Sequence, residues 1–379
     1  MYKKIKSKQL FDGFRFRPDE VLILNENDIV EDIVSAADAG EDVLTVEGIV
    51  SPGFINCHCH LELSHLKGKI EEATGLTGFV GRVVANRQAS AEIIENAIEE
   101  SEREMIKNGI VAVGDICNTA DTVVQKSKAN LYYHNFIEVL GFDPANAEAN
   151  FDQYSSIKKI FYDALPAEQV SFSPHAPYSV SAPLWQMLLD AEKKLITIHN
   201  QETTDENLLF ENKTGAFVDL YKKMNLNAEA FMATGKSSLQ SYLPKFNAGQ
   251  QLILVHNVHT SEKDILFTKV QPVHISWCFC PAANEYISRQ LPDITLFVKN
   301  NCSIVLGTDS LASNHQLSIW NEIEIIQKKF PHISLEMLLK WGTSNGAKAL
   351  GISGRYGSFE KGKKPGVLKL NEDAKPVLL

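Results

Sequence analysis

The sequence predicts an α/β protein: a (β/α)8 TIM barrel accompanied by a small β-sandwich domain that is built from both termini. The chain has 379 residues, enough for one barrel of ~250 residues and a smaller unit. Between Gly53 and Gly351, short apolar runs alternate with longer helical stretches, which is the order expected of repeated strand–helix units. The two ends of the chain instead carry short extended pieces that are separated by Gly, Asp and Asn.

Eight apolar runs carry the barrel prediction. Each is rich in Val, Ile, Phe or Leu and ends in residues such as Gly, Pro, Asp, Asn or His. Strands of a parallel sheet that are buried on both faces have this composition. We therefore expect strands within residues 53–60, 109–117, 131–140, 169–177, 194–202, 251–259, 274–281 and 303–310.

The segments between these runs have helical character. Apolar residues recur at three- and four-residue spacing over 91–106, and Asn108-Gly109 then ends the pattern as a helix C-cap would. A second helix is expected to begin at Ser181, which serves as its cap. A third helix is expected over 320–326.

An unusually long connection, from residue 203 to about 249, follows the fifth predicted strand. It contains helical pieces of its own at 215–224 and 237–242. A long connection after a barrel strand is often an active-site lid, and we expect that function here.

The two ends are expected to form one small β domain together. Short extended pieces occur at 21–24, 42–46 and 367–370. Neither end is long enough for a secure core alone. The predicted domains are therefore a β-sandwich made of residues 1–52 plus 353–379, and a barrel made of residues 53–352.

Composition and charge exclude several classes of protein. Hydrophobic residues make up 44% of the chain and charged residues 22%, as in soluble globular proteins. The net charge is −10, without a long basic run, so we expect no nucleic-acid partner. No apolar run reaches the ~18 residues of a membrane span and the start lacks a signal-peptide pattern, so we expect no membrane association and a cytoplasmic location. Six cysteines are too few for a disulfide scaffold.

Histidine and aspartate occupy the ends of several predicted strands. His58 and His60 share a face at the end of the first strand, because alternate residues of a strand point the same way. A His or an Asp also lies at the end of the fourth, fifth, sixth and eighth predicted strands. These residues are His175, His199, His256 and Asp309. The carboxyl ends of barrel strands meet around one axis, and three His with one Asp suit Zn²⁺ or Fe²⁺ with one position left for water. Structural, hydrogen-bonded imidazoles are the alternative.

With these motifs in order, the chain resembles the amidohydrolase superfamily, in the branch of the triazine hydrolases, cytosine and guanine deaminases and S-adenosylhomocysteine/methylthioadenosine deaminases. The resemblance covers nearly the whole chain. It departs at Ala283, where the family usually has Ser, and at Pro365-Gly366-Val367, where the family usually has Ala-Asp-Leu. The matching motifs are Pro52 to His60, His175-Ala176-Pro177-Tyr178, His199-Asn200-Gln201-Glu202-Thr203, Val255-His256, Cys280 to Asn284 and Gly307-Thr308-Asp309-Ser310.

The resemblance implies a role for individual residues. It implies that one divalent metal ion, Zn²⁺ by preference and Fe²⁺ as the alternative, is held by four residues: His58, His60, His199 and Asp309. It implies that Glu202 protonates a ring nitrogen of the substrate, and that His256 orients or deprotonates the attacking water. Asp309 can also accept the proton of that water. A Glu must have a raised pKa to act as an acid at neutral pH, which requires a closed, partly apolar cavity.

One metal ion is expected rather than two. Two-metal members of the superfamily usually bridge their ions with a carboxylated Lys or with a carboxylate from a middle strand. The fourth strand here ends in His175, with no Lys nearby. Glu138 on the third strand remains the candidate bridge to a second ion.

The substrate-binding residues are predicted from weaker patterns. His175 resembles the fourth-strand His that contacts the sugar in nucleoside-type deaminases, with a buried structural His as the alternative. The run 60–64 (His-Leu-Glu-Leu-Ser), followed by an apolar stretch with Arg82 and Arg87, resembles the aminodeoxyfutalosine deaminases of menaquinone biosynthesis. Either Arg could pair with the carboxylate of that substrate, or both could lie on a solvated helix face. Two further candidates for substrate contact are Trp277, which in this position is more often a core residue, and Asn284.

The sequence therefore predicts a metal-dependent aminohydrolase, a deaminase that uses a metal-activated water to displace ammonia from an aminated purine-like or other N-heterocycle. Aminodeoxyfutalosine or a related adenosine derivative is the candidate substrate. An amidohydrolase acting on another C–N or a C–Cl bond, such as a chlorohydrolase or a formimino or amide hydrolase, is the alternative, and a non-catalytic metal-binding relative is disfavoured. The expected partner is a small heterocyclic molecule, and a homo-oligomer is consistent with the family.

Overall fold

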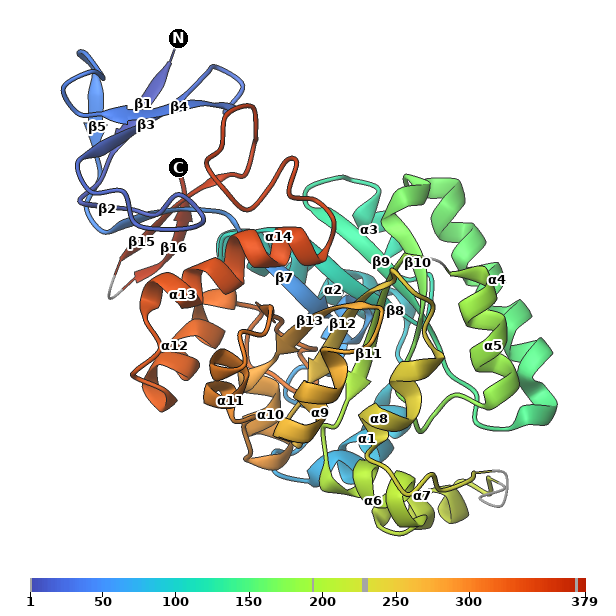
Figure 1. Ribbon diagram of the computed structural model, residues 1–379. Helices are drawn as coiled ribbons and strands as arrows, with labels where there is room; N and C mark the ends of the chain where they lie inside the picture. The colour runs from blue at the N-terminus through green and yellow to red at the C-terminus, as the bar shows by residue number, and fades with distance from the viewer. Residues whose placement is uncertain (1, 193, 227–230, 372–373) are drawn as a thin grey trace.

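Parallel strands form the centre of the molecule and helices surround them, in a computed structural model that describes residues 2–192, 194–226, 231–371 and 374–379 (Figure 1). The central strands form two four-stranded parallel sheets, with the orders β10-β9-β8-β7 and β11-β12-β13-β14. Their bounds are β7 Phe54–Cys59, β8 Ile110–Cys117, β9 Tyr132–Val139, β10 Val170–Pro174, β11 Leu195–Asn200, β12 Gln251–His256, β13 His274–Phe279 and β14 Ile304–Leu306. Each of them lies within one of the predicted apolar runs.

The two central sheets contact each other at both edges. At one edge the backbone N–H groups of Thr308 and Asp309 each donate to the His58 carbonyl at 3.0 Å, and Cys59 and Asp309 form an isolated parallel bridge. At the other edge the His199 N–H donates to the His175 carbonyl at 3.0 Å. Among the described residues, no continuous ladder joins the sheets at either edge. The predicted α/β class with parallel strands is confirmed.

The backbone turns sharply where these strands end. Gln201, His256 and Asp309 have φ angles of 46°, 72° and 58°, in the left-handed region that residues other than glycine rarely adopt. A residue in this conformation cannot continue a strand. Each such turn costs of the order of 1 kcal/mol and is typical of functional sites.

Helices cover the outside of the two sheets (Figure 1). The helix predicted over 91–106 is confirmed, because a helix spans Ala91–Lys107. It ends as predicted, with Asn108 as the C-cap and Gly109 following at φ +77°. The cap predicted at Ser181 is present in position only, because its hydroxyl makes no capping hydrogen bond.

Among the described residues, no helix is both long and apolar enough to cross a membrane. The principal helices are α1 Gly75–Asn86, α2 Ala91–Lys107, α3 Val123–Lys126, α4 Ala147–Ala164, α5 Ala182–Ala191, α9 Glu262–Thr268, α10 Pro281–Ser288, α11 Ile294–Lys299, α12 Ile319–Lys329, α13 Leu335–Lys340 and α14 Gly346–Ala349.

The described part of the long connection after β11 contains three further α-helices. They are α6 Thr204–Asn212, α7 Ala216–Lys223 and α8 Ser238–Tyr242, and the last two confirm the helical pieces expected from the sequence. Residues 227–230, within the same connection, lie outside the described residues. α7 contacts α1, so this connection reaches the segment that follows the first strand.

Strands from both ends of the chain pair with each other. One sheet has the order β4-β3-β1-β5, and a second has the order β16-β15-β6-β2. In the second sheet, β15 from the C-terminal segment is antiparallel to β6 from the N-terminal segment. Phe359 and Val367 are buried with Ile5, Leu22 and Val50 in one apolar cluster. The bounds are β1 Lys3–Lys6, β2 Gln9–Leu10, β3 Glu20–Leu24, β4 Val30–Ser35, β5 Val43–Thr45, β6 Ile49–Pro52, β15 Val367–Asn371 and β16 Ala374–Leu378.

Candidate active site

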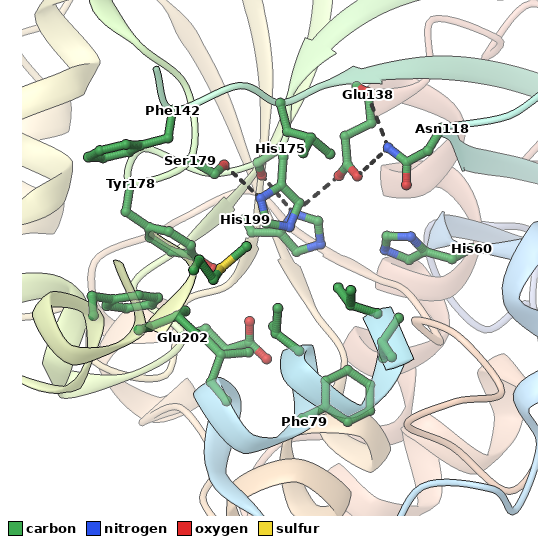
Figure 2. A pocket seen from close by; sticks show the side chains of 18 of the residues that line it. His60, Phe79, Asn118, Glu138, Phe142, His175, Tyr178, Ser179, His199 and Glu202 are labelled. Carbon is green, nitrogen blue, oxygen red and sulfur yellow. Dashed lines mark hydrogen bonds and ion pairs between the residues drawn. The ribbon is translucent and has the colours of Figure 1, made fainter. Parts of the chain in front are cut away.

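A cavity of about 370 Å³ lies where the strand ends meet. Figure 2 shows His60, His175, His199 and Glu202 around it, although they come from three separate segments of the chain. The predicted site residues that line the cavity are His60, Arg87, His175, His199, Glu202, His256 and Asp309. Residues up to 249 positions apart in the sequence are thus brought to one cavity, as the strand-end pattern predicted.

Four side chains at the strand ends offer a metal-binding arrangement: His58, which lies behind the cavity lining, and three that line the cavity, His60, His199 and Asp309. One ligand atom each from His58, His60 and His199 lies within 4.8 Å of the others. The Nε2 atoms of His58 and His60 are 3.2 Å apart, and Asp309 Oδ1 lies 3.6 and 3.4 Å from them. Burial lowers the pKa of both His58 and His60, so the rings are neutral and their lone pairs are available to a cation. This convergence of neutral imidazole nitrogens on a carboxylate fits a divalent ion such as Zn²⁺.

Neighbouring groups fix the orientation of two of these ligands. His199 Nδ1 lies 2.7 Å from the His175 carbonyl, to which it can donate, leaving Nε2 available as a ligand. The Ser313 hydroxyl donates to Asp309 Oδ2 at 2.6 Å. Burial alone raises the pKa of Asp309, but His60, His256 and the Ser313 hydroxyl more than offset this, so the pKa is held below its ordinary value.

Glu202 lies just past β11, in the wall of the same cavity. Its carboxyl is buried, and Oε1 has no hydrogen-bond partner among the described residues. Burial, and then the nearby carboxyls of Asp309 and Glu206, raise its pKa well above the ordinary value. The raised pKa favours the protonated form, in which Glu202 can donate a proton to a molecule in the cavity.

His256 is placed between the acid and a buried amide. Its Nε2 lies 3.7 Å from Glu202 Oε2, and its Nδ1 lies 3.0 Å from Asn284 Nδ2. Burial lowers the pKa of His256, so the ring is neutral. Asn284 was expected to contact the substrate, but it does not line the cavity and instead holds the His256 ring.

Two other predicted substrate contacts lie away from the cavity. Trp277 is buried in the hydrophobic core, with its ring 5.0 Å from that of Phe297. Arg82 is half-exposed and pairs with Glu71 at 3.3 Å. The structure thus brings Arg87 to the cavity, where its guanidinium pairs with the buried Glu62.

The apolar part of the cavity wall was predicted only in part: the long connection after β11 was expected to cover the site, whereas no such position was predicted for α1. Much of this wall comes from α1, and α7 with the residue that follows it adds Phe217, Leu220 and Met224. The α1 residues recur at helical spacing, which is a signal for one apolar face but does not reveal what that face covers. Sequence reasoning also missed Asn118 and Ser179, which bond Glu138 and His175 respectively. The α1 residues concerned are Leu76, Phe79, Val80, Val83 and Val84.

The amidohydrolase family model matches residues 49–368, most of the chain. The chain belongs to the amidohydrolase family. The resemblance inferred from the strand-end motifs is thereby confirmed.

This amidohydrolase has relatives that are named as deaminases. An adenosine deaminase of Helicobacter pylori is 27% identical over 324 residues, which is 83% of this chain and 77% of the relative. The Helicobacter pylori aminofutalosine deaminase, solved in complex with methylthio-coformycin, has the same fold with a TM-score of 0.79, 24% identity and coverage of 98% of this chain and 93% of that one. A zinc-bound adenosine deaminase from Xanthomonas campestris gives a TM-score of 0.76, 20% identity and coverage of 98% and 85%. These relatives support a hydrolytic deaminase.

Proposed function

We propose that this amidohydrolase is a metal-dependent deaminase of an adenosine-like nucleoside. One water is consumed per turnover: its oxygen becomes the ring carbonyl oxygen, and the amino group leaves as ammonia. The observation that carries the proposal is Glu202, a buried carboxyl with a raised pKa that lines the same cavity as the convergent His and Asp side chains. Hydrolysis of an amide does not need an acid aimed at a ring nitrogen, whereas an aminopurine does.

We assign the metal to His58, His60, His199 and Asp309. Three imidazole nitrogens and one carboxylate favour Zn²⁺, with Fe²⁺ as the alternative. When bound, such an ion lowers the pKa of a water molecule that it holds and so supplies a nucleophile at neutral pH.

The remaining steps belong to side chains of this chain. Glu202 donates its proton to the ring nitrogen next to the carbon that carries the amino group. His256, held by Asn284, orients the attacking water, and Asp309 accepts a proton from it. The proton that Asp309 accepts passes to the amino group as that group leaves as ammonia. The second proton of the water returns to Glu202 when its oxygen becomes the ring carbonyl, and the largely apolar cavity keeps bulk water out of these transfers.

We further propose that the two central sheets act as one closed (β/α)8 barrel over residues 53–352. The hydrogen bonds at both edges and the shared fold of the solved relatives support this reading. Residues 1–52 and 353–379 would then form a separate β-sandwich domain. Its own apolar cluster supports that division.

The apolar wall favours a nucleoside that carries an apolar extension. Aminodeoxyfutalosine and methylthioadenosine both meet this description. In the first case the substrate carboxylate would face Arg87, which is the predicted Arg that reaches the cavity. Because Arg87 already pairs with Glu62, its contribution to carboxylate binding is reduced to the guanidinium N–H groups that this pair leaves free.

Ammonia release from a substrate panel tests the proposal. The zinc-loaded enzyme would be assayed with adenosine, methylthioadenosine and aminodeoxyfutalosine, and in parallel with a chlorotriazine and a formimino compound. We expect ammonia from at least one 6-aminopurine nucleoside. Chloride or formamide release, without ammonia from any aminopurine, would overturn the proposal in favour of the alternative class.

A further inference from the structure

The ring of His60 has no outer hydrogen bond to orient it. Among the described residues, its Nδ1 atom has no partner, whereas the Nδ1 atom of His199 lies 2.7 Å from the His175 carbonyl. The Nε2 atom of His60 faces that of His58 at 3.2 Å. An imidazole that binds a metal is usually oriented by a hydrogen bond to its other nitrogen. The place of the His60 ring therefore depends on the backbone that carries it.

The backbone at His60 lies just beyond the strand. β7 ends one residue earlier, at Cys59. His58, which is inside β7, is held across the sheet edge through its carbonyl oxygen, which accepts the N–H groups of Thr308 and Asp309 at 3.0 Å. In the part of the chain that the structure describes, the His60 backbone has no such contact with the opposite sheet. Another group must therefore fix it.

Asp115, near the end of β8, bonds the residue that follows His60. It stands opposite Cys59 in the pairing of β7 with β8, and its Oδ1 atom accepts the backbone N–H of Leu61 at 2.9 Å. Leu61 begins a short 3-10 helix, Leu61–Leu66, for which His60 provides no side-chain cap. The first N–H of a helix has no partner within that helix. Asp115 thus holds the backbone directly after the proposed ligand.

A buried lysine balances the charge of Asp115. Lys126, at the end of α3, donates to Asp115 Oδ2 at 2.5 Å, and both side chains are fully buried. The Lys126 ammonium also lies 3.2 Å from Cys117 Sγ and 5.1 and 5.3 Å from the ring centroids of Tyr133 and Phe161. Burial alone lowers the pKa of Lys126, but Asp115 and then Cys117 raise it further than that, so the pKa is held above its ordinary value. Each oxygen of Asp115 therefore has its own donor, and a buried network with all its partners in place is rigid.

We propose that Asp115 is a positioning residue for the metal ligand His60, which it holds through the Leu61 N–H, and that Lys126 secures the Asp115 carboxylate. Neither Asp115 nor Lys126 lines the cavity. The inference rests on the proposed function, because that function assigns His60 to the metal. It adds that the affinity of this chain for its ion depends on a charge pair outside the cavity.

Two double variants that differ only at position 115 test the inference. The acceptor-free variant, Asp115→Leu/Lys126→Met, replaces the charge pair with apolar side chains of similar volume and leaves the Leu61 N–H without an acceptor. The acceptor-retaining variant, Asp115→Asn/Lys126→Met, also lacks the charge pair but keeps an amide oxygen for that N–H. Because neither variant leaves a buried charge without its partner, both should fold.

Zinc affinity is the readout that a purely structural role would not move. Competition with a chelator gives the dissociation constant of Zn²⁺, and the visible spectrum of the Co²⁺-loaded protein reports the geometry of the ligands. We expect the acceptor-free variant to bind Zn²⁺ about 10- to 100-fold more weakly than the wild type, as is typical when an outer partner of a metal ligand is lost, and to show an altered Co²⁺ spectrum. The acceptor-retaining variant should stay within a few-fold of the wild type.

A second buried pair provides a matched control. Lys158 and Glu192 are 3.1 Å apart, and Glu192 Oε2 accepts the backbone N–H of Phe172 at 3.0 Å. Phe172 lies within β10 and is not next to a proposed metal ligand. Lys158→Met/Glu192→Met therefore removes a comparable pair and a comparable acceptor, and it should leave the Zn²⁺ affinity unchanged.

Equal Zn²⁺ affinity in the acceptor-free and acceptor-retaining variants would overturn the inference, and so would an equal loss in the control pair. If the acceptor-free variant does not fold, Asp115→Asn with Lys126 in place gives the same test, because one amide oxygen cannot accept from both Leu61 and Lys126. Wild-type affinity in that variant would overturn the inference. Full Zn²⁺ affinity in His60→Ala would instead overturn the metal assignment of the proposed function.

Discussion

The two walls of the cavity are built in different ways. One wall consists of polar side chains at the ends of parallel strands, where His199, Glu202 and Asp309 converge. The other is an apolar surface from α1 and α7, which are separated by more than 100 residues in the sequence. Strand pairing fixes the polar wall, since each strand end is hydrogen-bonded near its neighbours. The apolar wall depends on the packing of two helices outside the sheets.

We expect the two walls to have different roles, one in catalysis and the other in the choice of substrate. The strand-end wall contains every residue that we assign to metal binding and proton transfer. The helical wall contains no candidate catalytic group among the described lining residues, and contributes area and shape. We therefore expect changes on the first wall to act on kcat, and changes on the second to act on KM and on the choice of substrate.

The largest effect is expected from removal of a proposed metal ligand. His199→Ala should lower bound metal well below one ion per chain and reduce ammonia release by at least about 1,000-fold, because the nucleophile is no longer generated. His332→Ala, which removes an exposed His outside the cavity, serves as the control. Elemental analysis and an ammonia assay make the measurement. Full activity in His199→Ala would show that this strand-end wall does not bind a catalytic metal.

A somewhat smaller effect is expected from Glu202→Gln. Bound metal should be retained while kcat falls by about 100- to 10,000-fold, as is typical when a general acid is lost. The raised pKa of Glu202 also predicts a pH dependence. Because the protonated form is the active one, wild-type activity should fall as pH rises through the pKa of Glu202. A pH–rate profile in which the residual activity of Glu202→Gln keeps the same alkaline fall would contradict the assignment.

On the helical wall the expected effects are modest. Met224→Ser removes an apolar side chain from the cavity rim and should raise KM for methylthioadenosine by about three- to ten-fold, with kcat nearly unchanged. Adenosine, which lacks the extension, should be affected less. Met232→Ser is the matched control, because Met232 is 77% exposed and does not line the cavity. A change in kcat alone would contradict the division between the two walls.

The smallest expected effect is on the free energy of unfolding and arises from Glu322. Glu322 is buried and accepts hydrogen bonds from the Ala282 N–H at 2.8 Å and from Asn314 at 3.1 Å. Burial raises its pKa from the ordinary 4.5 to about 8. The folded state therefore holds this proton more tightly than the unfolded state, so the free energy of unfolding falls as pH rises from about 4.5 to 8.

Glu322→Gln should reduce this pH dependence. Urea unfolding at pH 5.5 and pH 8 would measure it, and the difference between the two free energies should be smaller in the variant than in the wild type. Glu324→Gln, on the exposed face of the same helix, should keep the wild-type difference. An identical pH dependence in Glu322→Gln would show that this carboxyl does not retain its proton on folding.

The sequence predicted the polar wall far better than the apolar one. His58 and His60 were placed together by strand alternation alone, and the remaining strand ends followed from the parallel arrangement. Arg82 and Arg87 could not be separated by motif, although five residues along a helix rotate a side chain by about 140°, so both could hardly face one cavity. Trp277 was indistinguishable from a stacking residue because sequence does not tell which face of a buried strand a side chain occupies.

The remaining failures have the same cause. Asn284 was recognised as part of a motif but not as the partner of His256, since that contact joins α10 to β12. The length of the connection after β11 predicted that it would lie over the site, but which side chains of α7 reach the cavity depends on how this connection packs, and no local pattern encodes such packing. Local sequence patterns thus predict the residues at the strand ends, whereas the positions of the other cavity residues depend on tertiary packing.

The proposed metal ligands come from both central sheets. His58 and His60 follow β7 in one sheet, whereas His199 and Asp309 follow β11 and β14 in the other. An ion held by all four would cross-link the two sheets at a place where, among the described residues, no continuous backbone ladder joins them. Its dissociation constant would then report on how tightly the sheets are docked, and substitutions far from the cavity that loosen this docking would be detected as weaker metal retention before any unfolding is seen.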